Sequence, residues 1–465
     1  MGEATDDVTR RLTGIVGAEN VLTGDAVTED YTGDEALTGG RAKPRWVVRP
    51  GTAEEVAAVL AEATEHGVPV TARGSGTGLS AAARPHPDGL VVSFERMNSV
   101  LEIDEGNHVA VVQPGVTLSE LDEKTARAGL GYTVYPGEMS ASVGGNVGTN
   151  AGGMRAVRYG VTRHNVLGLR AALPTGELIR SGGRTVKTAS GYDLTQLVIG
   201  SEGTLALATE ITVKLYPRLP HSATVLAPFD DLDTVMRAVP EIVSSGLEPH
   251  ILEYIDALTM AAITHGTQLS LGIPDEVRDA SQAYLVVGLA NRAADRLDGD
   301  VEVLGTLLGD LGAADVYVLE GSSARRLIEA RENAFWTAKA AGADDVLDVV
   351  VPRSALPEFL AESRAAAQRA ESGVIGCGHA GDGNVHLAVF QPDPRRRSAL
   401  LEEIFAAGMR LGGAISGEHG LGHAKTGYFL RLEDPTKIDL MRRLKQAFDP
   451  AGILNPGVLF GGRED

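Results

Sequence analysis

The sequence of 465 residues has one cysteine, Cys377, and no long apolar run. A single thiol cannot form a disulfide within the chain, which fits a reducing compartment, and it cannot hold an iron–sulfur cluster. No apolar stretch approaches the roughly 20 residues of a transmembrane helix, and the acidic N-terminus lacks the apolar core of a signal peptide. We therefore expect a cytoplasmic protein, with peripheral docking at a membrane left open.

Basic residues are also scarce. The chain carries 42 Lys and Arg against 62 Asp and Glu, a net charge of −20 at pH 7. This charge opposes non-specific binding to nucleic acid, and no basic block offsets it, although a local pocket for a small anion remains compatible with it. The 43% hydrophobic content is ordinary for globular proteins, and the length suggests about three domains.

Histidines are concentrated in two short segments of the second half. Four of the 11 histidines lie in Cys377-Gly-His-Ala-Gly-Asp-Gly-Asn-Val-His386 and Ser416-Gly-Glu-His-Gly-Leu-Gly-His423. His379, His386 and the distant carboxylate Glu418 can surround a divalent cation on three sides, which leaves His419 to accept a proton. Zinc is favoured, with manganese or iron as alternatives. The competing interpretations are buried core histidines, or Cys377 as a further ligand instead of a small core residue.

The first half has two glycine-rich segments, of which the first follows a predicted strand. Gly74, Gly76 and Gly78 alternate, yet the expected helix of a dinucleotide fingerprint is missing after them, so a flexible loop or an anion-binding nest competes with that interpretation. The second segment has five glycines between 144 and 153. A disordered loop is one interpretation. We favour a backbone-lined cradle that closely approaches a flat ligand and its phosphates.

The pattern of elements changes near Tyr216-Pro-Arg-Leu-Pro220. We predict a first domain of residues 1–219, an α+β domain with an antiparallel sheet over 220–412, and a C-terminal segment of 413–465. Thr52 is the predicted N-cap of a helix, because Glu55 follows three positions later and apolar residues then recur on one face. A single long helix is expected over 322–340, with Arg331 in its middle.

Taken together and in order, these motifs resemble the FAD-linked oxidases and dehydrogenases of the vanillyl-alcohol oxidase type. The resemblance is greatest to the branch of D-lactate dehydrogenase, the glycolate oxidase catalytic subunit and D-2-hydroxyglutarate dehydrogenase. It rests on Arg73-Gly-Ser-Gly-Thr-Gly-Leu79, Pro136-Gly-Glu138 with Ser142 to Gly153, Gly200-Ser-Glu-Gly-Thr-Leu205, Gly378 to His386, Ser416 to Gly422, Phe448-Asp-Pro450 and Asn455-Pro-Gly457. It implies a two-subdomain FAD-binding (PCMH-type) domain, an α+β substrate domain and a C-terminal segment that returns to the flavin.

The resemblance also implies an FAD site. Its expected residues are Arg73, Gly74, Ser75, Gly76, Thr77, Gly78, Leu79, Pro136, Gly137, Ser142, Val143, Gly144, Gly145, Asn146, Gly148, Thr149, Asn150, Gly152, Gly153, Glu202, Gly203, Ile211 and Asn455. Some relatives attach FAD covalently through a His or Cys of the first loop. Here that loop offers Ser75, Thr77 and Ser80, so we expect noncovalent FAD.

By the same resemblance, His379, His386 and Glu418 bind a metal, His419 is the base, Arg331 holds the substrate carboxylate and Asn384 contacts the substrate. The implied reaction oxidises a D-2-hydroxy acid, and a quinone, a cytochrome or an electron-transfer flavoprotein then accepts the electrons. The oligomeric state is open, with a homodimer among the options.

Relatives that act on diacids carry a lysine near Val346, so its absence favours a monocarboxylate such as D-lactate over 2-hydroxyglutarate. The alternatives are a glycolate oxidase subunit that needs partner chains, D-2-hydroxyglutarate dehydrogenase, and a flavin-binding partner protein without catalysis.

Overall fold

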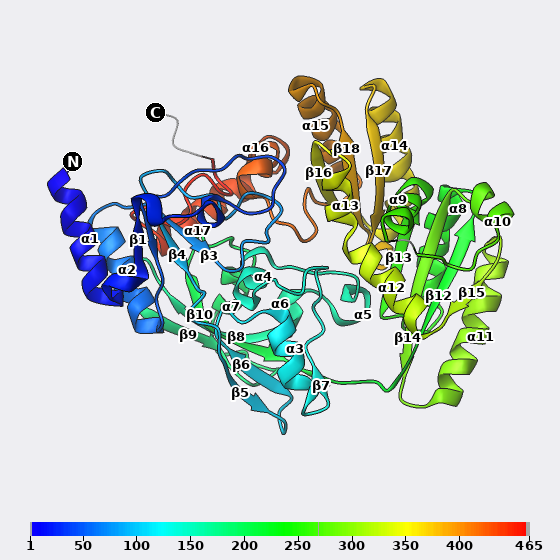
Figure 1. The fold of residues 1–465 in the computed structure, drawn as a ribbon, viewed down its shortest axis with the longest axis horizontal. Coiled ribbons are helices and arrows are strands. Elements are labelled where there is room, and N and C mark those ends of the chain that lie inside the picture. Colours follow the sequence, from blue (N-terminus) through cyan, green and yellow to red (C-terminus); the bar gives the residue numbers. More distant parts are fainter. Residues whose placement is uncertain (1, 268, 462–465) are drawn as a thin grey trace.

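A computed structural model describes residues 2–267 and 269–461. Figure 1 shows two lobes: an N-terminal lobe that carries β1 to β11, and a second lobe that carries β12 to α15. The N-terminal lobe begins with a four-stranded sheet of order β1-β2-β4-β3, in which only β1 is antiparallel to its neighbour. Its strands and flanking helices are β1 (Val21–Thr23), β2 (Trp46–Val48), β3 (Val70–Arg73), β4 (Leu90–Ser93), α1 (Gly2–Val16) and α2 (Ala53–Glu65).

Helix α2 begins where the sequence predicts. The Thr52 side chain accepts a hydrogen bond from the Glu55 N–H, which satisfies one of the free donors of the first turn. Val56, Val59 and Leu60 are fully buried against the sheet, since their spacing places them on one face of the helix.

The other sheet of this lobe is antiparallel and has five strands in the order β5-β6-β10-β8-β9. A two-stranded sheet of β11 and β7 lies beside it. The elements are β5 (Val100–Asp104), β6 (Val109–Val112), α3 (Leu118–Ala126), β7 (Leu130–Gly131), α4 (Val143–Thr149), α5 (Ala156–Tyr159), α6 (Thr162–Asn165), β8 (Val166–Ala172), β9 (Leu178–Gly182), α7 (Leu194–Val198), β10 (Leu207–Lys214) and β11 (Tyr216–Pro217).

The second lobe contains a seven-stranded antiparallel sheet of order β15-β12-β14-β13-β17-β18-β16. Its elements are β12 (His221–Phe229), α8 (Leu232–Ser244), β13 (Ile251–Asp256), α9 (Ala257–Thr267), α10 (Asp275–Ala280), β14 (Ala283–Asn291), α11 (Ala294–Asp310), β15 (Tyr317–Leu319), α12 (Gly321–Glu332), α13 (Ala334–Ala340), β16 (Asp345–Val350), α14 (Leu356–Arg369), β17 (Gly373–Gly378), β18 (Asn384–Phe390) and α15 (Pro394–Arg410).

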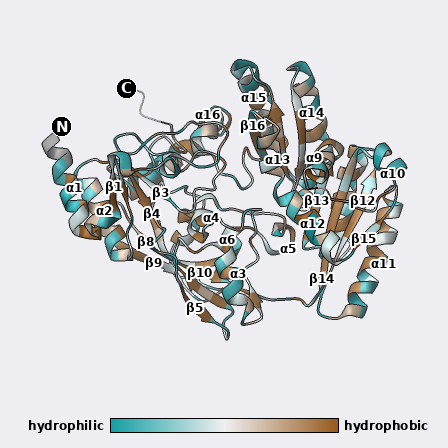
Figure 2. Cartoon of the chain, in the orientation of Figure 1, coloured by the Kyte–Doolittle hydropathy of each residue, from teal (hydrophilic) through white to brown (hydrophobic). Residues whose placement is uncertain are grey.

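Successive side chains along each strand of this sheet point to opposite faces. Leu347, Val349 and Leu387 point into a large core with α8, α14 and α15. The intervening residues, such as Asp348 and His386, therefore face the other side, where α9 and α12 pack. Figure 2 shows the hydrophobic strands between helices whose outer faces are hydrophilic.

The C-terminal segment returns to the N-terminal lobe. Helices α16 (Gly422–Leu432) and α17 (Pro435–Phe448) lie against that lobe in Figure 1, and Leu454 makes a parallel bridge to Val70. This return was expected. The predicted domain bounds, 1–219, 220–412 and 413–465, remain a prediction. Among the described residues, no helix is long and apolar enough to cross a membrane.

One local expectation was wrong. The single helix predicted over 322–340 is interrupted at Asn333, so Arg331 lies near the end of α12 and not in the middle of a helix. In the second glycine-rich segment, where a backbone-lined cradle was favoured over a disordered loop, the first half forms α4. Ser142 caps this helix by accepting a hydrogen bond from the Gly145 N–H at 3.1 Å. A side-chain cap and two buried valines offset the weak helix propensity of glycine.

Candidate active site

A long cavity in the N-terminal lobe lies between the two glycine-rich segments. Residues 74–79 and the 136–149 region with α4 line it, and the 201–203 turn and the C-terminal segment contribute further walls. A Cβ added at Gly148 would meet no atom within 4 Å, and one at Gly145 would meet only the Ser142 hydroxyl. Gly145 and Gly148 of α4 therefore leave room for a ligand directly against the helix backbone.

Most of the predicted cofactor residues line this cavity. They are Gly74, Ser75, Gly76, Thr77, Gly78, Leu79, Pro136, Gly137, Ser142, Gly144, Gly145, Asn146, Gly148, Thr149, Glu202, Gly203 and Asn455. Six others lie elsewhere: Arg73, Val143, Asn150, Gly152, Gly153 and Ile211. Val143 and Ile211 are fully buried in the core beneath, because each is an apolar residue on the inner face of its element.

The remaining four predicted positions contact other parts of the protein and do not line the cavity. Arg73 donates to the Asp30 carbonyl and lies 5.4 Å from the Tyr31 ring centre. Asn150 ends α4 in the left-handed conformation, with φ 55°, and its side chain accepts the Arg163 N–H. A Cβ at Gly153 would lie 1.7 Å from the Tyr135 carbonyl oxygen, and one at Gly152 would lie 2.7 Å from Glu418 Oε2.

The C-terminal segment closes one end of this cavity. The buried Glu202 carboxylate accepts the N–H groups of Leu421 and Gly422. Asn455 donates to the carbonyls of Ala82 and Glu202, at 2.9 and 2.8 Å. These bonds fix the turn that carries His419 against the two loops of the first lobe.

A second cavity meets the first one. Leu79, Pro136, Gly137, Glu332, Phe335, Glu418 and His419 line both cavities. The second cavity continues between the sheet of the second lobe and helices α9, α12 and α13, and it also contacts Arg331, His379 and His386. A group bound in the first cavity can therefore face a small molecule in the second, beside His419.

The predicted ligands converge on the wall of the second cavity. Glu418 Oε1 lies 3.0 Å from His379 Nε2 and 3.3 Å from His386 Nε2. His379 follows β17 and His386 lies on β18, and the short turn Ala380–Asp382 connects these strands. The residues between the two histidines thus form the turn of a hairpin, and this hairpin places both rings beside Glu418.

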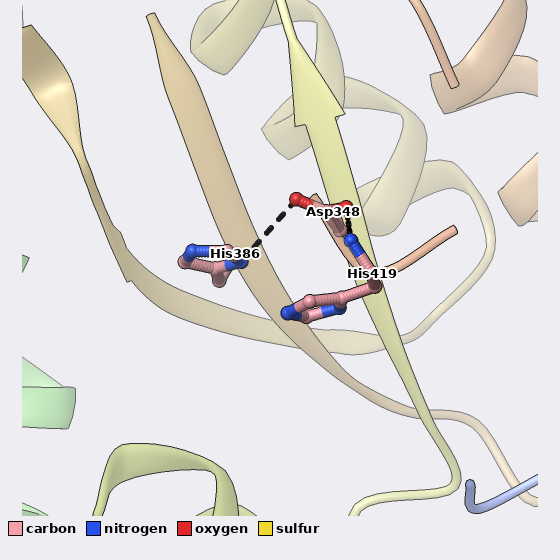
Figure 3. Close-up of side chains that lie close together, drawn as sticks. All are labelled: Asp348, His386 and His419. Carbon is pink, nitrogen blue, oxygen red and sulfur yellow. Dashed lines mark hydrogen bonds and ion pairs between the residues drawn. The ribbon is translucent and has the colours of Figure 1, made fainter. Parts of the chain in front are cut away.

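Asp348 holds the turn that carries His419. Its Oδ2 accepts the N–H of His419 at 2.7 Å, the N–H of Glu418 at 2.9 Å and the Ser416 hydroxyl at 2.7 Å. Figure 3 shows Asp348 between the backbone of His419 and the ring of His386, whose Nδ1 is 3.6 Å away. The rings of His386 and His419 are stacked, with centres 5.0 Å apart.

A second buried carboxylate, Glu253 on β13, contacts both His379 and Arg331. Its Oε1 lies 2.6 Å from His379 Nδ1, and its Oε2 lies 2.7 Å from Arg331 Nη2. Sequence reasoning gave no role to Glu253 or Asp348. The available signal was a carboxylate within an otherwise apolar strand, in Ile-Leu-Glu-Tyr and in Leu-Asp-Val-Val.

Burial and charge shift the titration of these groups. Although burial disfavours the charged imidazole, Glu253 and Glu418 raise the pKa of His379 to about 10. Burial also opposes the Glu253 carboxylate, but the charges of His379 and Arg331 keep its pKa below the ordinary value. Burial lowers the pKa of His419 to about 4, so this imidazole is neutral at pH 7.

The cluster has the spacing and charge that suit a divalent cation. Ligand atoms on an ion with bonds of roughly 2.0–2.2 Å lie about 3 to 3.5 Å apart, as the Glu418–His379 and Glu418–His386 pairs do. Glu253 supplies the carboxylate that commonly orients a metal-binding histidine from behind. An alternative group, Asp348 with His386 and His419, is less suited, since the Asp348 oxygens already accept four hydrogen bonds.

Two other candidates, Asn384 and Cys377, lie outside the cluster of His379, His386 and Glu418. Asn384 was expected to contact the substrate, but it lines neither cavity. Its side-chain N–H groups donate to Asp348 Oδ1 at 2.8 Å and to the Val349 carbonyl at 3.1 Å, so it holds Asp348 in place. Cys377 lies opposite His386 on the neighbouring strand and belongs to none of the clusters with metal-binding spacing among the described residues.

Comparisons with known proteins agree with this geometry. Residues 44–182 match an FAD binding domain, and residues 218–459 match the C-terminal domain of FAD linked oxidases. The chain belongs to the FAD-linked oxidase family. It is therefore an FAD-linked oxidoreductase.

Three relatives in this family cover nearly the whole chain. An uncharacterized FAD-linked oxidoreductase of Mycobacterium tuberculosis is 65% identical over 98% of this chain and 99% of its own length. A D-lactate dehydrogenase of Anaerostipes hadrus is 36% identical, with 95% of both chains covered. Glycolate oxidase subunit GlcD of Bacillus subtilis is 35% identical over 98% of this chain and 97% of its own.

The fold is also that of solved PCMH-type flavoproteins. The structure of p-cresol methylhydroxylase with substrate bound superposes with a TM-score of 0.82, covering 99% of this chain and 97% of that one. At 17% identity this likeness concerns the fold. It confirms the expected α+β architecture of two domains with a PCMH-type fold.

Proposed function

We propose that this FAD-linked oxidoreductase oxidises a D-2-hydroxy monocarboxylate to the 2-oxo acid, with D-lactate the simplest candidate. The observation that carries the proposal is the wall shared by the two cavities. His419 and Glu418 lie on it, so one imidazole faces both the cofactor cavity and the smaller cavity that contains Arg331. The resemblance to D-lactate dehydrogenases supports the choice of substrate.

When bound, FAD supplies a two-electron acceptor and a divalent metal supplies a Lewis acid, zinc being the first candidate. His379, His386 and Glu418 would hold that metal. Asn146, Glu202 and the backbone of 74–79 and 144–149 would hold the noncovalent FAD.

The chain's own residues bind and orient the hydroxy acid. Arg331 lines the second cavity with a buried guanidinium that Glu253 holds in place through Nη2, and such a planar cation suits a substrate carboxylate. The neutral His419 would accept the hydroxyl proton, and FAD, when bound, would take up the C2 hydrogen with its electron pair. The substrate would thus lose one proton and one hydride, and a separate acceptor, such as a quinone, a cytochrome or an electron-transfer flavoprotein, would take the two electrons.

Anaerobic bleaching of the purified flavoprotein tests this proposal. We expect the flavin absorbance to bleach with D-lactate and not with L-lactate, and metal analysis of the same sample to find about one divalent ion per chain. Glycolate should be tested in parallel with and without candidate partner subunits, since GlcD is also similar. If no 2-hydroxy acid of either hand reduces the flavin, the proposed activity is wrong.

A further inference from the structure

The second cavity extends well beyond the groups that perform the chemistry. Cys377, His386 and Asp348 lie opposite one another on β17, β18 and β16, and form a row across the sheet. Two residues farther along the same strands, Ile375, Ala388 and Val346 form the next row. Because the side-chain period of a strand is two, both rows face the same side, roughly 7 Å apart.

All three residues of this second row line the cavity. The side of the cavity formed by the sheet is thus polar at the row of His386 and entirely apolar at the row of Ala388. Helices α9 and α13 also line the cavity, with the apolar side chains of Ala262, Ile263 and Ala338 and the hydroxyl side chains of Thr259 and Thr337. Ala341, just after α13, also lines the cavity and is exposed, so the apolar end reaches the surface.

The charges of the cavity are confined to its other end. Among the described residues that line it, the titratable side chains other than Tyr135 and Cys377 are Arg331 and Glu332, together with His379, His386, Glu418 and His419. Arg331 is the one guanidinium among them, and there is no lysine. A substrate with a second carboxylate would place it against the row of Ile375, Ala388 and Val346 with no cation to offset its desolvation.

We propose that the row of Ile375, Ala388 and Val346 forms a side-chain pocket for D-2-hydroxy acids with an extended apolar chain, and that these are better substrates than D-lactate. The inference rests on the proposed function and adds the substrate class. With the carboxylate at Arg331 and the hydroxyl beside Glu418, the side chain extends from the row of His386 to the row of Ala388. A methyl group would leave this second row empty, whereas several methylene groups would fill it.

A series of D-2-hydroxy acids of increasing chain length tests the pocket in the holoenzyme. We expect kcat/KM for flavin reduction to rise about 4-fold for each methylene group, the value of about 0.8 kcal/mol per buried CH₂, from lactate through butanoate to hexanoate analogues. D-2-hydroxyglutarate should reduce the flavin more slowly than D-2-hydroxyhexanoate, because its second carboxylate meets the apolar row.

Two variants and a matched control locate the effect. Ala338→Leu and Ala388→Leu fill the pocket from a helix and from the sheet, so each should abolish the advantage of the hexanoate analogue while D-lactate still reduces the flavin. Ala340→Leu makes the same change on the exposed side of α13 and should retain the wild-type series. Two filling variants are needed because one of them alone could fail to fold.

The possible outcomes separate the two proposals. If D-lactate reduces the flavin as fast as the longer acids, or if both filling variants keep the chain-length series, the apolar pocket is wrong and the proposed oxidation stands. If no hydroxy acid of any length reduces the flavin, the proposed oxidation itself is wrong.

Discussion

At the scale of single residues, the site depends on buried charges that hold one another in place. Glu253 contacts both His379 and Arg331, and Asp348 accepts the backbone N–H groups of Glu418 and His419. Each carboxylate extends from a strand of the sheet and thus fixes the position of residues that would bind the substrate or the metal. Removing one charge from such a buried pair leaves its partner uncompensated, so effects on function should be large.

Replacing His419 by Asn should remove proton transfer and leave the cofactor bound. The imidazole faces the cavity, while its backbone N–H is held by Asp348, and the variant keeps that bond. We expect anaerobic flavin reduction by a D-2-hydroxy acid to slow by at least about 100-fold. His423→Asn is the control, since His423 on the neighbouring helix lines neither cavity. Rapid reduction in His419→Asn would exclude this residue as the base.

Glu253→Gln should weaken the metal site. The substitution keeps the shape of the side chain but removes the charge that faces His379 Nδ1 at 2.6 Å. Metal affinity should fall about 10- to 100-fold, as measured by chelator competition, while FAD content stays constant. Glu241→Gln, an exposed residue of α8, should leave both unchanged. Equal metal affinity in the two variants would contradict the assigned role of Glu253.

At the scale of elements, α4 shows how a glycine-rich helix can form a binding surface. Its two valines pack into the core, and Gly145 and Gly148 line the cavity, where side chains would occupy the space of a ligand. The Ser142 cap holds its first turn. The same segment therefore combines a buried side with a backbone surface that a flat cofactor can approach closely.

Gly148→Leu should block FAD binding without unfolding the chain. The position opens onto the cavity, so the added side chain meets no protein atom near its Cβ and fills the space of the ligand. We expect FAD affinity to fall at least about 100-fold in a fluorescence titration, equivalent to about 2.7 kcal/mol. Gly14→Leu on α1 also points into open space, but toward solvent, and should bind FAD normally. Tight FAD binding by Gly148→Leu would show that the cofactor lies elsewhere.

At the scale of the whole molecule, the site forms only where the lobes meet. The first lobe supplies the cavity lined by the glycine-rich segments, the second supplies the histidine hairpin and Arg331, and the C-terminal segment supplies Glu418 and His419. Contacts between the lobes should therefore affect activity and stability together. His250, the residue before β13, is close enough to Arg155 and Arg158 of the first lobe for their charges to act on its imidazole.

Acid should destabilise the protein partly through His250. Burial lowers the pKa of His250 from 6.5 to about 4, and the charges of Arg155 and Arg158 add to this effect. Between these two pH values, the unfolded chain therefore binds a proton at His250 and the folded chain does not. The stabilisation is present above pH 6.5 and is lost as the pH falls toward 4, by about 3 kcal/mol at most. His250→Gln should flatten denaturant-measured stability over this range, whereas His221→Gln, at an exposed position, should not. Parallel pH profiles for wild type and His250→Gln would refute this origin.

The sequence by itself determined the local parts of the site. The His379–His386 turn, the Glu418-His419 pair, the cap at Thr52 and the glycine loops are short-range patterns, and the chain geometry follows from their spacing. Only the tertiary structure decided which distant residues support them. The strand order β13-β17-β18-β16 brings Glu253 and Asp348 to the histidines and continues the cavity over Val346 and Ala388. In the other lobe, the packing of α4 against β10 places Val143 and Ile211 in the core. Such contacts depend on how strands far apart in the chain pair, and local spacing does not specify that pairing.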